Sequence, residues 1–134
     1  MAQSLSLDPA WEKQISLQDR RLVETAFAQA KDDMNHAKSF TYLRHDFNHE
    51  GALLIVVLIH NWSQRPLELL DELLVCFNTE QVEVARHFFS LPFQLSAQTS
   101  TPWTLIFPKG TYQETIYNTE ELSVHSFFGS QSQE

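Results

Sequence analysis

Cysteine and glycine are both scarce in this 134-residue chain, and each scarcity excludes a class of structure. Cys76 is the single cysteine, so no disulfide can form within the chain. Only 3 glycines are present, which argues against the glycine-rich loops that bind phosphates and dinucleotides. Because Cys76 lies between Val75 and Phe77 in an apolar segment, we expect a buried and unreactive thiol rather than a nucleophile.

Positive charge is also in short supply, with 9 basic against 17 acidic residues and a formal net charge of -8. Such a charge repels nucleic-acid phosphates and anionic lipid, so we expect no nucleic-acid partner and no direct membrane insertion. The longest apolar run, residues 52–59, is far shorter than the ~20 residues that span a bilayer. Residues 1–9 lack the basic and apolar regions of a signal peptide, which favours a cytoplasmic location.

Residues that could perform chemistry are present but are not grouped in known patterns. His45 and His49 are four residues apart in a strand-and-turn segment, where that spacing does not place two side chains on one face. We therefore expect the histidines to lie on the surface or at sheet edges, and we predict no metal site, no cofactor and no catalytic residue. The six histidines are His36, His45, His49, His60, His87 and His125.

The N-terminal part is predicted to be helical. Residues 1–15 form a leader in which Asp8 and Pro9 open one helical turn, with Trp11 and Ile15 as apolar anchors. Ser16 is a typical N-cap, and an apolar stripe at helical spacing predicts one amphipathic helix over residues 17–34. The stripe consists of Val23, Ala26, Phe27, Ala30 and Met34.

The rest of the chain is rich in short apolar segments separated by turns, which predicts strands. The clearest are residues 40–44, 52–60, 73–77, 82–86, 103–107 and 122–127, with 52–60 as a central strand and Trp103 in the core. Residues 67–72 fit a helix or a strand equally well. The fold class is mainly β: residues 16–134 form a single immunoglobulin-like antiparallel β-sandwich of about six to seven strands, with one N-terminal amphipathic helix.

Large aromatic and cationic side chains outside the predicted strands are the candidates for contact with another protein. Trp62 and Arg65 share a loop, and this composition is typical of an interface hot spot, although Trp62 fits a cap on the end of the sandwich equally well. The predicted helix has Arg21 on its polar face. The candidate contact residues are Trp11, Ile15, Arg21, Trp62 and Arg65.

Four segments resemble the SLAP domain of Firmicutes. They are residues 5–15, the apolar strand 54–61 that ends in His60-Asn61, residues 84–88 with an Ala-Arg-x-x-Phe type pattern, and residues 100–107 with Pro102-Trp103. The resemblance covers about residues 5–128. It implies a non-catalytic adaptor or chaperone that assists surface-layer protein assembly through the accessory Sec system, from the cytoplasmic side.

The partner that this resemblance implies is a surface-layer precursor or the secretory ATPase. The family often carries the domain in tandem, whereas the sequence holds one copy of the pattern. The alternative is therefore a structural or regulatory domain that associates with itself as a homodimer.

Overall fold

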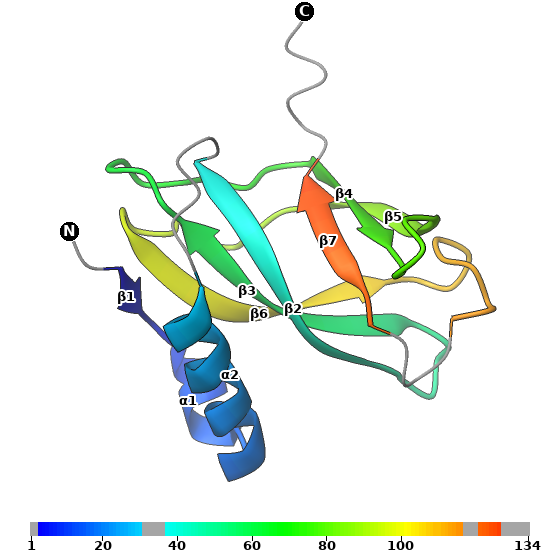
Figure 1. The fold of residues 1–134 in the computed structure, drawn as a ribbon, viewed down its shortest axis with the longest axis horizontal. Helices are drawn as coiled ribbons and strands as arrows, with labels where there is room; N and C mark the ends of the chain where they lie inside the picture. Colours follow the sequence, from blue (N-terminus) through cyan, green and yellow to red (C-terminus); the bar gives the residue numbers. More distant parts are fainter. Residues whose placement is uncertain (1–2, 31–36, 117–120, 127–134) are drawn as a thin grey trace, which may run out of the picture.

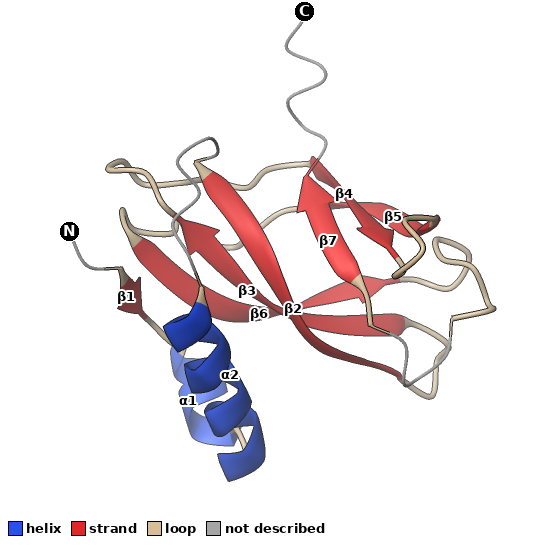
Figure 2. Ribbon diagram, in the orientation of Figure 1, coloured by secondary structure: helices blue, strands red, loops and turns tan. Residues whose placement is uncertain are grey.

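Two β-sheets and a pair of helices make up the computed structural model, which describes residues 3–30, 37–116 and 121–126 (Figure 1). The elements are β1 (Ser4–Leu5), α1 (Pro9–Gln14), α2 (Leu17–Gln29), β2 (Lys38–Phe47), β3 (Leu53–Asn61), β4 (Glu72–Phe77), β5 (Glu83–Phe89), β6 (Thr99–Phe107) and β7 (Ser123–Ser126). One sheet has the order β1-β6-β3-β2, and the other has the order β5-β4-β7. Figure 2 shows the two helices together on one side of the strands.

The strand β3 lies between β2 and β6, as its continuous apolar sequence predicts. Its register with β6 runs without interruption from Leu53 opposite Phe107 to Asn61 opposite Thr99. Alternate residues of β3 point into the core between the two sheets, and these are Leu53, Ile55, Val57 and Ile59. The residues between them therefore lie on the opposite side of the four-stranded sheet, away from the other sheet, and we call this side the outer face.

An ion pair also joins the two sheets. The Lys38 ammonium of β2 lies 2.5 Å from the Glu72 carboxylate of β4, and both side chains are largely buried. The same carboxylate accepts a hydrogen bond from the Ser126 hydroxyl of β7. Glu72 thus joins strands of both sheets at one point.

The expected strands are largely found, since each of β2 to β7 overlaps one of them. The last one was expected to include Phe127, which lies outside the described residues. Trp103 is half-buried beside the core, with its ring edge-on to Phe93 at 5.3 Å between centroids. The mainly β class is confirmed, and β1 adds a strand that runs parallel to β6 within the leader.

The expectation of one amphipathic helix over residues 17–34 is wrong in its length, and the helical turn expected at Asp8 and Pro9 is a short helix of its own. A separate helix, α1, precedes it, because Asp8 caps residues that begin with a proline at the first turn. The second helix starts after the Ser16 cap as predicted but ends at Gln29, because Ala30 has an extended backbone with ψ of 142°. Residues 31–34, including Met34 of the predicted stripe, lie outside the described residues.

The ambiguous segment 67–72 forms no helix. Leu67 exchanges two backbone hydrogen bonds of 2.8 Å with Leu95, which makes an isolated bridge. Asp71 has a positive φ of 47°, which a helix does not allow, and β4 starts at the next residue. Pairing with the segment around Leu95 therefore decides the conformation, and the local sequence does not.

Candidate protein-contact site

The leader is fixed to the edge of the four-stranded sheet by backbone hydrogen bonds. The Ser4 amide donates to the Gln98 carbonyl and the Ser6 amide to the Ser100 carbonyl, both at 2.9 Å. The Gln3 side-chain amide donates to the Asn61 carbonyl at 3.0 Å and to the Ser100 hydroxyl at 3.2 Å. The chain therefore enters α1 from a defined position beside β6.

The two helices cover part of the outer face. Asp19 of α2 forms two hydrogen bonds of 3.1 Å with the Arg44 guanidinium of β2, and this pair ties the helix to the sheet. Arg20 of α2 lies 3.3 Å from the Glu12 carboxylate of α1 and so joins the two helices. Among the residues of both helices, only Val23 is buried. The helices are thus attached to the sheet along one side and leave most of their surface open.

Trp11 and Ile15 come together in a hollow between the helices and the sheet. The hollow has a volume of about 310 Å³. The sheet lines the hollow through Thr104 of β6, on the outer face. The full lining consists of Ala10, Trp11, Gln14, Ile15, Asp19 and Thr104. Both predicted anchors are half-buried, so they hold the leader against the sheet and also border an open space.

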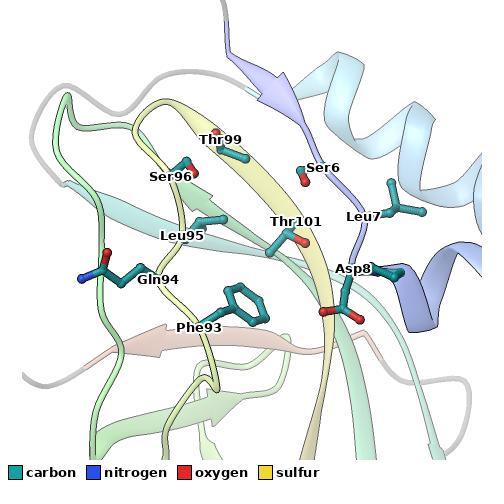
Figure 3. A pocket seen from close by; sticks show the side chains of 10 residues that line it. Ser6, Leu7, Asp8, Phe93, Gln94, Leu95, Ser96, Thr99 and Thr101 are labelled. Atoms are coloured by element: carbon teal, nitrogen blue, oxygen red, sulfur yellow. The ribbon is translucent and has the colours of Figure 1, made fainter.

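A second hollow, of about 200 Å³, lies between the leader and the loop before β6. Figure 3 shows Phe93 and Thr101 pointing into the space that Asp8 borders from the leader. The Asp8 carboxylate already accepts a hydrogen bond of 2.9 Å from the Ala10 amide, as the cap of α1. This hollow therefore separates the leader from the loop 93–96 just where the leader leaves β6.

The remaining candidate residues do not join Trp11 and Ile15 in their hollow. Arg21 is exposed on α2, near Leu17, whose side chain is 65% exposed at the start of the same helix. Trp62 follows β3; its indole nitrogen donates to the Ser39 hydroxyl at 2.8 Å, so part of the ring serves the fold. Arg65 is exposed in the same loop. The five candidates therefore occupy two separate regions, the helices and the loop after β3.

Sequence reasoning missed a buried polar cluster at the end of β3. His60 is only 1% exposed, and its two ring nitrogens lie 2.8 Å from the Thr41 hydroxyl and 2.6 Å from the Ser100 hydroxyl. A neutral imidazole can satisfy both hydroxyls because one nitrogen donates while the other accepts. The Trp62 ring stacks on the imidazole at 4.8 Å. Burial lowers the pKa of His60 to about 4.

Asn61 closes the same end of the strand and is fully buried. Its side-chain nitrogen donates to the carbonyls of Arg65, Leu95 and Ser96 at 2.8, 3.0 and 3.0 Å. Its side-chain oxygen accepts from the amide and the hydroxyl of Ser63. One side chain therefore holds the loop after β3 and the loop before β6, and its backbone carbonyl holds Gln3 of the leader.

The expectation that the histidines lie on the surface or at sheet edges is wrong for His60, which is buried on the inner strand β3, whereas His45 is buried but lies on the edge strand β2. His45 is accommodated by the Tyr42 hydroxyl, 2.7 Å from one ring nitrogen, and by the rings of Tyr42 and Phe47. His36 lies outside the described residues. The polar pair His60-Asn61 at the end of an apolar strand was the signal for the cluster, since buried polar groups need partners.

Cys76 is buried, as its apolar neighbours predict. Within residues 3–30, 37–116 and 121–126, no three histidine, cysteine or acidic side chains gather as metal ligands would. In the same residues, no helix has the length and apolar character needed to cross a membrane. The features that stand out are open helix surface, two hollows beside the leader and exposed strand edges, and all of these are suited to contact with a polypeptide.

Comparison with known proteins adds one finding. Neither the curated proteins nor the solved structures yielded a match to this chain. A family model described as the SLAP domain matches residues 5–127, which is nearly the whole chain and includes both helices and the strands β2 to β7. The chain therefore belongs to the SLAP domain family.

Proposed function

We propose that this SLAP domain is a non-catalytic protein-binding module that assists the secretion or assembly of surface-layer proteins through the accessory Sec system. The family match supports this role, because the family is named for its link to that system. A cytoplasmic location belongs to the same proposal, and fractionation of host cells with an antibody against the chain tests it. We also propose that the two sheets form an immunoglobulin-like sandwich.

The open surface of the helical pair is the observation that carries the binding role. Of the residues in α1 and α2, only Val23 is buried, although both helices are capped and tied to the sheet or to each other by ion pairs. A defined helix with an open side is a common docking element for another protein. Leu17 and Arg21 lie on this open side and combine an apolar contact with a cationic one.

The chemistry of the chain favours a partner with a basic surface. The net charge of -8 accelerates encounter with such a surface by electrostatic steering, and this effect weakens as salt is added. The secretory ATPase and the surface-layer precursor are the two partners that the family membership proposes. Binding to each purified protein, measured at low and at moderate salt, separates them.

The deciding experiment uses the full chain with substitutions on the helices. Leu17→Ser combined with Arg21→Ala should weaken binding to the true partner at least about tenfold, since it removes an apolar and a cationic contact. Val82→Asp is the matched control, because Val82 is also an exposed apolar residue but lies before β5, away from the helices. Unchanged affinity of the helix variant for both partners would refute the helical surface as the binding site.

A further inference from the structure

The strand β6 has an edge that is only partly occupied. β1 covers it at Thr99 and Ser100, where the hydrogen bonds from Ser4 and Ser6 show that even-numbered residues of β6 direct their backbone groups to this edge. Pro102 is the next such residue and has no amide hydrogen, so the pairing with β1 cannot continue past it. The leader turns away at this point and becomes α1.

Beyond Pro102 the edge is open. Since the register between β3 and β6 has no shift, the alternation continues, and the amide and carbonyl groups of Thr104 and Ile106 face the edge. Within the described part of the chain, no hydrogen bond reaches these edge-facing groups. Ile106 is also 52% exposed. An unpaired edge with an exposed apolar residue and no charge between Thr104 and Ile106 is a template for another strand.

The β5 edge of the other sheet is less available. The Arg86 amide of β5 donates to the Thr111 carbonyl at 3.0 Å, and the Gln113 amide donates to the Val84 carbonyl at 2.8 Å. The segment 111–113 thus covers much of the outer side of β5. This difference favours β6 over β5 as an edge for pairing with another chain.

We propose that β6 pairs with β6 of a second copy of this chain, in antiparallel orientation, around a twofold axis at Leu105. In this register Thr104 of each copy lies opposite Ile106 of the other. Each such pair exchanges two backbone hydrogen bonds, so the free edge groups of Thr104 and Ile106 in both copies are all used. A strand that matches itself in this way forms an isologous dimer with one continuous sheet.

The side chains on the outer face fit the same register. Ile106 of the second copy lies beside Thr104, and Thr104 borders the hollow of about 310 Å³ that Trp11 and Ile15 line. The exposed isoleucine of each copy therefore faces this hollow of the other, in which Trp11 and Ile15 supply the apolar contacts. The leader contributes to the dimer through Trp11 and Ile15, which both hold α1 on the sheet and contact Ile106 of the second copy.

The negative charge of the chain opposes dimerisation and makes the dimer depend on salt in a characteristic way. Two copies that each carry a net charge of -8 repel one another, and salt screens this repulsion. The dimer should consequently become stronger as salt is added. Binding to a basic partner through the helices would have the opposite salt dependence, so the two interactions can be separated in one protein.

Sedimentation equilibrium of the full chain, over a range of protein and salt concentrations, tests the dimer. Ile106→Pro removes an edge-facing amide without touching the pairing with β3, as Pro102 does naturally, and Ile106→Lys places a charge on the edge. We expect both variants to stay monomeric where the parent chain is dimeric. Phe88→Lys is the matched control, because Phe88 is an exposed apolar residue on β5 and the charge change is identical.

Hydrogen exchange on the unmodified chain provides a measurement that needs no variant. The amides of Thr104 and Ile106 should exchange more slowly as the protein concentration rises, whereas exposed amides of the helices should not change. A parent chain that is monomeric throughout, a dimer that persists in both Ile106 variants, or edge amides whose exchange ignores concentration would each overturn the proposal.

Discussion

The buried imidazole of His60 makes the stability of this domain depend on pH in a predictable way. In the folded chain burial lowers the pKa of His60 to about 4, whereas an exposed histidine has a pKa of about 6.5. Between about pH 4 and pH 6.5, His60 is therefore protonated in the unfolded chain and neutral in the folded chain. The free energy of unfolding therefore includes a contribution that is complete above about pH 6.5 and is lost as the pH falls toward about 4.

The size of this contribution follows from the gap between the two values. Each pK unit corresponds to about 1.4 kcal/mol, so the fall from about 6.5 to about 4 corresponds to about 3 kcal/mol. This is a large part of the ~5–15 kcal/mol that stabilises a typical domain. The acid limit of the fold should thus depend strongly on one histidine.

Urea unfolding at pH 7, 6, 5 and 4 measures the effect, with His60→Gln as the reference because glutamine does not bind a proton in this range. Between pH 7 and pH 4 the free energy of unfolding of the parent chain should fall by about 3 kcal/mol more than that of the variant. The variant costs stability at neutral pH, because it disturbs the hydrogen bonds with Thr41 and Ser100. All other titratable groups are the same in both proteins, so their contributions cancel in the difference. Parallel pH profiles for the two proteins would refute the assignment of the acid sensitivity to His60.

Three further predictions concern the core, and each is checked by the midpoint and slope of denaturant unfolding. Glu72→Leu removes the carboxylate that Lys38 contacts at 2.5 Å, and it should lower the free energy of unfolding by about 3 kcal/mol because the ammonium is left buried without its partner. The double variant Lys38→Met/Glu72→Leu should recover much of this loss, and equal losses in the single and the double variant would contradict the prediction. Asn61→Leu removes the amide that donates to three carbonyls, of which Leu95 keeps the Leu67 amide and Arg65 keeps the Ser63 hydroxyl as a donor. The variant should cost about 2–3 kcal/mol, and a loss below about 1 kcal/mol would show that water replaces the amide. Trp103→Ala should cost about 2 kcal/mol, less than a fully enclosed ring, because the side chain is half-buried; a negligible loss would place the ring in solvent.

Local sequence signals predict the fold well where one strong interaction decides the conformation. Residues 52–60 are apolar at every position up to His60, and only a strand with neighbours on both sides buries them all, as β3 does. Ser16 begins α2 because its hydroxyl accepts from the Asp19 amide at 3.0 Å, which requires only four adjacent residues. These elements follow from contacts that are close in sequence or from burial alone.

Elements that depend on distant partners could not be predicted in this way. β1 has two residues and exists because Gln98 and Ser100 offer carbonyls to it from almost a hundred residues away. The conformation of Leu67 depends on its bridge to Leu95 in a distant loop. No local pattern in the sequence encodes these partners.

The polar residues at the end of β3 show why the candidate site was harder to predict than the fold. Read alone, His60 and Asn61 look like the solvated end of a strand. In the structure they are buried because Gln3, Thr41 and Ser100 converge on them from three different segments. Such a cluster fixes the leader relative to β6, and the position of the leader in turn creates the hollow at Trp11 and leaves the β6 edge open after Pro102. The surface that we propose for contact with another copy is therefore a consequence of buried polar hydrogen bonds, which a search for exposed aromatic and basic residues does not detect.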